Sequence, residues 1–135
     1  MIGIREAKAA FFDVKAVMDA VDRHRLRALS RFGYFVRQDS RQSIRKRKRP
    51  SRPGQAPSNR TGLLKRFILF SYDAGRRSVV IGPARLSGVA DPASPEALEA
   101  GGSTKAGRIS PRPYMKPAFD RQLEKHVPAM WRNGL

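Results

Sequence analysis

The sequence predicts a single α+β domain, in which a long N-terminal helix and a C-terminal helix pack on a small antiparallel β-sheet with long basic and Gly/Pro-rich loops. Apolar residues recur at helical spacing in residues 5–46 and again in residues 113–133. Between them, two runs of branched and aromatic residues flank a turn-forming triplet, as in a β-hairpin. A chain of 135 residues suffices for one core, so residues 1–135 are treated as one domain.

The first predicted helix covers residues 5–46, which contain no proline. It carries two apolar stripes, and the second stripe is out of phase with the first, so we expect a bend or two consecutive helices near residues 22–25. Gly33 and Ser40 share the side of the second stripe; they either admit a neighbouring backbone or weaken the helix interior. The stripes comprise Val14, Met18 and Val21, then Leu26, Leu29, Phe32, Gly33 and Val36.

A basic, Pro/Gly/Ser-rich loop is predicted over residues 47–62, because Arg49 precedes Pro50 and is disfavoured in a helix. Cations in a last helical turn favour the negative end of the helix dipole, but this explains only part of the charge. Residues 50–59 have turn chemistry, and we expect them to be exposed and mobile. Seven cations lie at the end of the predicted helix and the start of this loop. We call them the basic block: Arg41, Arg45, Lys46, Arg47, Lys48, Arg49 and Arg52.

A β-hairpin is predicted over residues 63–83. Leu64, Ile68, Phe70 and Tyr72 share one parity in a first strand over residues 63–72, although Arg66 and Phe67 break the alternation. The triplet Asp73, Ala74 and Gly75 forms the turn, and residues 77–81 return as a second strand that ends at Gly82 and Pro83.

Residues 84–112 are predicted to form a long loop with at most one helical turn, over residues 95–100. The last helix, within residues 113–133, places Pro117 at its first position. We expect Pro128 to end or kink this helix, and Trp131 to anchor the core rather than an interface. Its apolar stripe comprises Phe119, Leu123, Val127 and Met130.

The composition is strongly basic. Twenty-eight Lys and Arg against 11 Asp and Glu give a net charge of +17 and an isoelectric point near 11.6. This charge predicts a polyanionic neighbour, whether nucleic acid, an anionic membrane or an acidic protein ring. Cysteine is absent, so the fold needs no disulfide and has no thiolate metal site. No apolar run is long enough to span a bilayer and the first residues lack a signal-peptide core, which predicts an unsecreted protein without a membrane partner.

Enzyme chemistry finds little support in the sequence. His24 and His126 are its only histidines, and Glu124 lies two residues from His126, on a different side of a helix. Neither a zinc-protease motif nor a GxSxG nucleophile elbow occurs. Gly101, Gly102 and Gly107 lack the lysine and the strand-to-helix junction of a phosphate-binding loop. We predict no catalytic residue, no cofactor and no metal site.

Four short elements occur in an order that resembles the small tail-completion or neck proteins of long-tailed bacteriophages. They are a Pro-x-x-Arg-Thr-Gly-x-Leu element, a strand closing in Gly-Pro, a Leu-Glu element followed by glycine, and an Arg-Pro-aromatic-Met-x-Pro-Ala element. Ala100 departs from this pattern, because the family often has an aromatic residue there, and the spacer over residues 84–94 is long. The matching residues are Arg60, Thr61, Gly62, Gly82, Pro83, Leu98, Glu99, Gly101, Gly102, Arg112, Pro113, Tyr114, Met115 and Pro117.

The resemblance implies a non-enzymatic virion protein, assembled in the host cytoplasm and located in the neck or tail. It implies a ring of six copies that completes the tail and joins it to the head around the DNA channel. Its partners would be the head-closure, tail-terminator and tail-tube proteins, and the basic block would contact either the DNA or an acidic neighbouring ring. Two alternatives remain open: a stand-alone nucleic-acid-binding module, and an interaction protein whose basic face is solvated.

Overall fold

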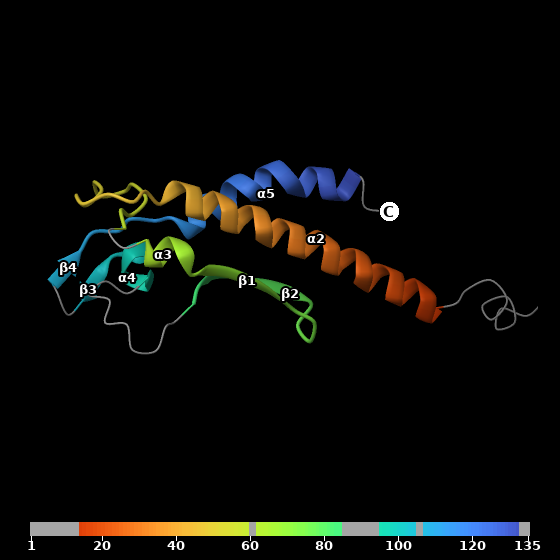
Figure 1. Cartoon of the computed structure of the whole chain (residues 1–135). Helices are drawn as coiled ribbons and strands as arrows, with labels where there is room; N and C mark the ends of the chain where they lie inside the picture. Colours follow the sequence, from red (N-terminus) through yellow and green to blue (C-terminus); the bar gives the residue numbers. More distant parts are fainter. Residues whose placement is uncertain (1–13, 60–61, 85–94, 105–106, 133–135) are drawn as a thin grey trace, which may run out of the picture.

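The computed structural model describes residues 14–59, 62–84, 95–104 and 107–132, and it confirms the α+β fold (Figure 1). The central helix α2 lies between α5 on one side and the β1–β2 hairpin on the other, and it packs against both. A second hairpin, β3–β4, lies beside α4, at the end of the molecule away from the turn of the β1–β2 hairpin. The elements are α2 (Val14–Ser43), α3 (Leu63–Arg66), β1 (Ile68–Asp73), β2 (Ser78–Pro83), α4 (Pro95–Ala100), β3 (Gly102–Thr104), β4 (Gly107–Ile109) and α5 (Met115–Arg132).

Helix α2 runs without interruption through the 30 residues Val14–Ser43, so the expected division into two helices is wrong. The two stripes are out of phase, but this does not force a break in the helix. The residues of the first stripe are exposed, so they need not face the same neighbour as the second stripe. The helix also ends three residues before the predicted end. Ser43 Oγ donates to the carbonyl of Ser40 (2.7 Å) in the last turn, and Ile44 then turns into the core. The predicted part over residues 5–13 lies outside the described residues.

The C-terminal half of α2 forms one of two core clusters. Phe32 and Val36 are buried against Ala118 of α5, and the ring of Phe32 meets that of Phe119 edge-on at 5.5 Å. Gly33 faces the hairpin: a Cβ there would lie 2.8 Å from Val79 Cγ2. The small residue therefore admits a close neighbour, as one of the two readings of the sequence held, and that neighbour belongs to the same chain. Partly buried Val79, Ile81 and Met115 complete this cluster.

The β1–β2 hairpin confirms the predicted turn and return strand. The strands pair antiparallel from Ile68 opposite Pro83 to Asp73 opposite Ser78, and the Asp73 carboxylate accepts the N–H of Arg76 (3.1 Å) in the turn. The first strand is shorter than predicted, because residues 63–66 form the helical turn α3. The broken alternation at Arg66 was the signal: a helical turn buries Leu64 while leaving Arg66 exposed.

The remaining elements correct the prediction in two places. The helical turn over residues 95–100 is confirmed as α4, but residues 102–109 contain β3 and β4, which the sequence prediction left as loop. Strands of three residues that include glycine are too short to show alternation. Helix α5 starts at Met115, with Pro117 as its third residue, and continues past Pro128 to Arg132. Pro128 has no backbone N–H, so the carbonyl of Glu124, four residues earlier, lacks its helical donor. Both residues are exposed, and water can donate to this carbonyl instead. The side chain of Trp131 lies outside the described residues.

Candidate nucleic-acid interface

The second core cluster gathers the family-like elements at one end of the molecule. Tyr114, with 1% of its surface exposed, is buried with Ile44, Leu64 and Ile68. Three residues from separate segments pack against this cluster: Ala56 from the loop after α2, Leu98 from α4 and Met115 from α5. Burial raises the pKa of the Tyr114 phenol, and the nearby Glu99 carboxylate raises it further, so this side chain stays protonated and uncharged.

Glu99 joins the Leu-Glu element to the start of α5. Its carboxylate accepts hydrogen bonds from the backbone N–H groups of Tyr114 (3.0 Å), Met115 (3.1 Å) and Lys116 (2.8 Å). These donors have no partner inside the helix, and an anion is favoured at a helix N-terminus. The backbone N–H of Arg112 also donates to the Leu98 carbonyl (2.6 Å). Two elements that look unrelated in the sequence thus form one structural unit.

The motif glycines have conformational roles. Gly62 has a φ of 77°, which glycine adopts without a steric cost, and caps the start of α3 between the helical and β regions. Gly101 has a φ of 75°, and a Cβ there would lie 2.9 Å from Pro111 Cδ. Gly82 and Pro83 end β2 opposite Leu69 and Ile68. Arg60 and Thr61, the other predicted residues of the first element, lie outside the described residues.

The loop after α2 is held by hydrogen bonds. Residues 50 and 52–55 are exposed, as predicted, whereas residues 51 and 56–59 are partly or fully buried, which the prediction of an exposed loop over residues 50–59 missed. The N–H of Gly54 donates to the Pro111 carbonyl (2.9 Å), and the N–H of Asn59 donates to the Arg45 carbonyl (3.0 Å). The Arg112 guanidinium donates through Nε to the Ser51 carbonyl (3.1 Å). Pro57 is buried. Turn residues gave no sign of this, because the contacts come from a segment far away in the sequence.

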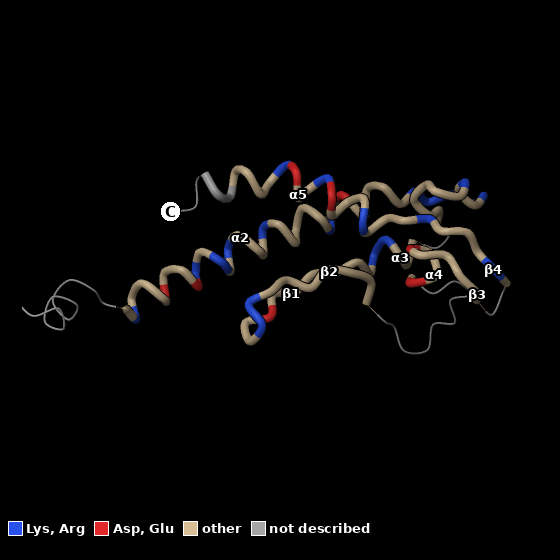
Figure 2. Tube along the Cα trace, turned by 180° about the vertical axis from the view of Figure 1, so that it is seen from behind, with Lys and Arg blue, Asp and Glu red and all other residues tan. Residues whose placement is uncertain are grey.

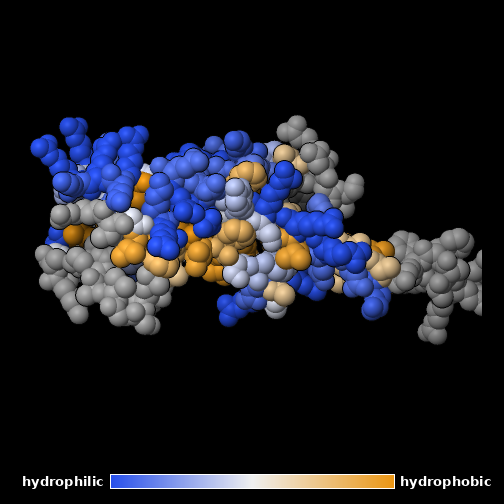
Figure 3. Space-filling view, in the orientation of Figure 1, coloured by the Kyte–Doolittle hydropathy of each residue, from blue (hydrophilic) through white to orange (hydrophobic). Residues whose placement is uncertain are grey.

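The basic block lies on this loop, where α2 stops. Figure 2 shows its cations along the segment that follows the helix, and Figure 3 shows hydrophilic side chains gathered over the same end. Arg41 alone among the seven belongs to the last turn of α2, so the helix dipole accounts for little of this charge. The other six are exposed, and none of the ion pairs found between described residues includes a block cation. The sequence also has no acidic residue between Asp39 and Asp73.

A pocket of about 350 Å³ opens within the basic block. Its wall includes Arg45, Arg47 and Ser51. The Ser51 hydroxyl oxygen has no hydrogen-bond partner among the described residues, but it is buried and therefore closed to the pocket space. The pocket is lined by cationic and polar residues.

A second uncovered surface lies on the N-terminal half of α2. Val14, Val17, Met18 and Val21 follow one another at helical spacing and are 66%, 49%, 46% and 41% exposed. We call these four residues the apolar stripe. The sequence predicted an apolar helical face here but gave no sign that these side chains stay exposed, because periodicity does not reveal the partner of a face.

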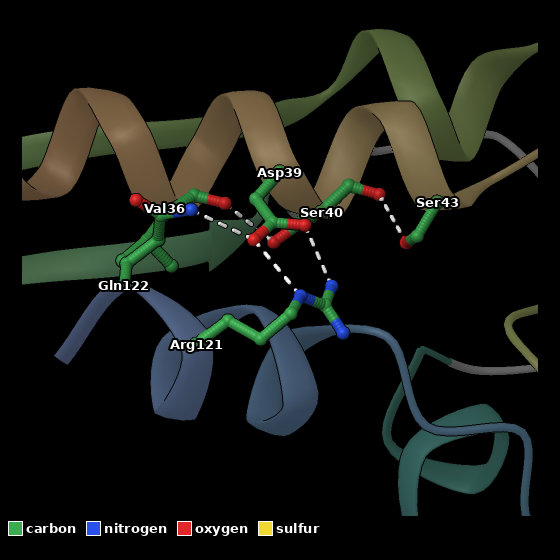
Figure 4. Close-up of polar contacts among 6 residues, drawn as sticks. All are labelled: Val36, Asp39, Ser40, Ser43, Arg121 and Gln122. Carbon is green, nitrogen blue, oxygen red and sulfur yellow. Dashed lines mark hydrogen bonds and ion pairs between the residues drawn. The ribbon is translucent and has the colours of Figure 1, made fainter. Parts of the chain in front are cut away.

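An ion pair fixes α5 against the C-terminal half of α2 (Figure 4). Arg121 donates to the Asp39 carboxylate through Nε (3.0 Å) and Nη2 (2.6 Å), and Gln122 Nε2 donates to the same carboxylate (2.8 Å). The hydrogen bond from Arg121 outweighs the effect of burial and lowers the pKa of Asp39 below its usual value.

His126 stacks on Phe35, with ring centroids 4.3 Å apart and planes at 9°. Within the described ranges, no three His, Asp or Glu residues lie close enough to hold a metal ion. Among those same ranges, no helix has both the length and the apolar character needed to cross a membrane. Comparisons with protein-family models, with curated proteins and with solved structures found no match for this chain.

Proposed function

We propose that this chain is a non-enzymatic structural protein of the phage neck, which completes the tail and joins it to the head as a homo-oligomeric ring around the DNA channel. One observation carries the proposal beyond the order of the sequence elements. Two uncovered surfaces, the apolar stripe and the basic block, lie towards opposite ends of α2. An exposed apolar helix face is typical of a protein–protein contact, and a dense cationic face is typical of a contact with a polyanion.

The two surfaces would have different roles in a ring. In a head-to-tail ring each subunit presents one patch to the neighbour before it and another to the neighbour after it, and the apolar stripe would be one of these two patches. The apolar stripe would serve subunit contact, and the basic block would face the DNA. The neighbours in the virion would be the head-closure, tail-terminator and tail-tube proteins, and no cofactor or metal takes part.

Particle mass tests assembly directly. The double variant Val17→Ser/Val21→Ser removes apolar surface from exposed positions, so it should fold like the wild type but fail to form rings in mass photometry. Val80→Thr is the matched control, because Val80 is also exposed but lies on β2, outside the stripe. If the wild type, the double variant and Val80→Thr form rings equally well, the stripe is not part of the subunit contact.

A stand-alone nucleic-acid-binding module is the second candidate. It is favoured by the basic block itself, whose six loop cations are exposed. It predicts a monomer that binds DNA of any sequence, with an affinity that falls steeply with salt. A neck protein and this module differ in size: the first forms rings or enters tails, whereas the second stays a monomer when tails are added.

A further inference from the structure

We infer that the pocket in the basic block takes one phosphate group of a nucleic-acid backbone. The inference rests on the proposed function only for the source of the phosphate, which is the DNA in the channel. The pocket itself is defined by the structure, and its wall includes Ser43, Arg45, Arg47, Ser51, Gln55 and Ser58.

The wall has the chemistry that phosphate oxygens require. Arginine, serine and glutamine side chains are among those that contact nucleic-acid phosphates in proteins, and arginine binds a phosphate through two parallel hydrogen bonds. Gln55, whose side-chain amide can donate to a phosphate oxygen, is an exposed residue of this wall. A water takes up about 30 Å³ of liquid, so a pocket of about 350 Å³ has room for a phosphate group and several waters.

The pocket is built by the fold. The carbonyl of Arg45 accepts the N–H of Asn59, and this bond holds the two sides of the loop together in parallel register. The N–H of Gln55 donates to the carbonyl of Arg52 in a turn (3.1 Å), and Ala56, which also lines the pocket, packs against the core cluster of Tyr114. The Arg112 guanidinium holds the carbonyl of Ser51.

The surroundings favour a polymer of phosphates over a single anion. Lys46, Lys48, Arg49 and Arg52 are exposed on the same loop but are not part of the pocket wall. They can contact the phosphates on either side of the bound one, as cations that track a nucleic-acid backbone do. A single carboxylate from a protein partner would leave these four cations unused.

A comparison of two charge-matched variants tests the inference. Arg45→Gln/Arg47→Gln removes two charges from the wall of the pocket, and Lys46→Gln/Lys48→Gln removes two charges from the same loop outside the wall. Binding of the full-length chain to a short fluorescent DNA duplex is measured by anisotropy between 50 and 200 mM NaCl. The pocket predicts that the arginine variant binds about tenfold more weakly than the lysine variant at equal salt. Equal losses in the two variants would overturn the inference and leave only diffuse attraction.

Gln55→Ala provides a test that changes no charge. Gln55 is an exposed residue of the pocket wall, so its truncation should leave the thermal unfolding midpoint unchanged, while DNA binding should weaken about tenfold through the loss of one hydrogen bond to a charged group. Unchanged DNA binding by this variant would contradict the pocket, even if the arginine variant proved unstable.

Inorganic phosphate, added at constant ionic strength, distinguishes the source of the phosphate group. A backbone phosphate is held with its flanking cation contacts, so millimolar phosphate should leave the duplex bound to the wild type. If millimolar phosphate displaced the duplex, the pocket would be a site for free phosphate, and the inference of a nucleic-acid phosphate would be overturned. Ring formation is scored separately by mass: rings without pocket-dependent DNA binding reject this inference alone, and pocket-dependent binding by a lasting monomer rejects the neck function alone.

Discussion

The two halves of α2 have similar apolar patterns but different fates. In the C-terminal half, Phe32 and Val36 are buried between α5 and the hairpin, and Gly33 lets the hairpin approach closely. In the N-terminal half, the apolar stripe has the same helical spacing and remains exposed. Periodicity therefore shows that a helix face is apolar, whereas the cover of that face depends on which other segments reach it. The uncovered half is the part of the helix that remains available for another subunit.

The largest expected difference between the halves comes from truncating one apolar side chain in each. Phe32→Ala leaves a cavity against Ala118 and Phe119, and it should lower the free energy of unfolding by about 3 to 5 kcal/mol. Met18→Ala, on the exposed half, should change it by less than about 0.5 kcal/mol. Urea unfolding of both variants measures the difference. A similar loss in the two variants would mean that the stripe is covered within the monomer.

Enlarging a small residue sharpens the same comparison. Gly33→Val places new atoms against Val79 and Phe70, where even a Cβ would lie 2.8 and 2.9 Å from their side chains. The overpacking should cost about 1 to 3 kcal/mol. Ala16→Val is the matched change on the exposed half, where the β-branched residue loses only helix propensity, at most about 0.7 kcal/mol. Thermal unfolding should separate the two variants; an unchanged Gly33→Val protein would show that the hairpin does not press on α2.

The sequence predicted the elements whose signal is local. The two long helices, the Asp73 turn and the helical turn at residues 95–100 follow from short patterns of residue types. It missed features set by distant segments. Residues 50–59 are held by Pro111 and Arg112, and the Glu99 carboxylate finds its partners 15 to 17 residues further along.

The candidate site divides in the same way. Runs of lysine and arginine are visible in any sequence, so the basic block was predictable. The pocket was not, because its wall forms only when the backbones of Arg45 and Ser58 pair across the loop.

The ion pairs of the two halves should respond differently to pH. The pKa of Asp39 is lowered in the folded protein, so its pair with Arg121 stabilises the fold above the usual carboxyl pKa of 3.8, and this contribution is lost as pH falls through the lower folded value. Arg121 is half exposed, so Asp39→Asn should cost only about 1 kcal/mol at pH 6.

The matched change on the exposed half is Asp19→Asn, which removes the 3.7 Å pair between Asp19 and Lys15. This variant should unfold like the wild type at pH 6, because the pair is exposed. Asp39→Asn should lose less stability than the wild type between pH 6 and pH 3, as measured by urea unfolding. If Asp39→Asn lost as much stability in acid as the wild type, the pair between Asp39 and Arg121 would not stabilise the packing of α5 on α2.

The smallest effect on stability is expected beyond the end of α2, in the basic block. Replacement of the five cations at residues 45–49 by glutamine should change the free energy of unfolding by less than about 0.5 kcal/mol, because these side chains are exposed. DNA binding should fall, and its dependence on salt should flatten: five lost phosphate contacts reduce the log–log slope by about 4.5. A variant that fails to fold would show that the block has a structural role.

The mass of the purified chain, measured by mass photometry with and without phage tails, tests the neck proposal most directly. The proposal predicts closed rings of uniform mass, or incorporation of the chain into tails, and loss of both when Val17 and Val21 are replaced by serine. A wild-type chain that remains a monomer at every concentration, ignores the tails and only binds DNA would contradict it.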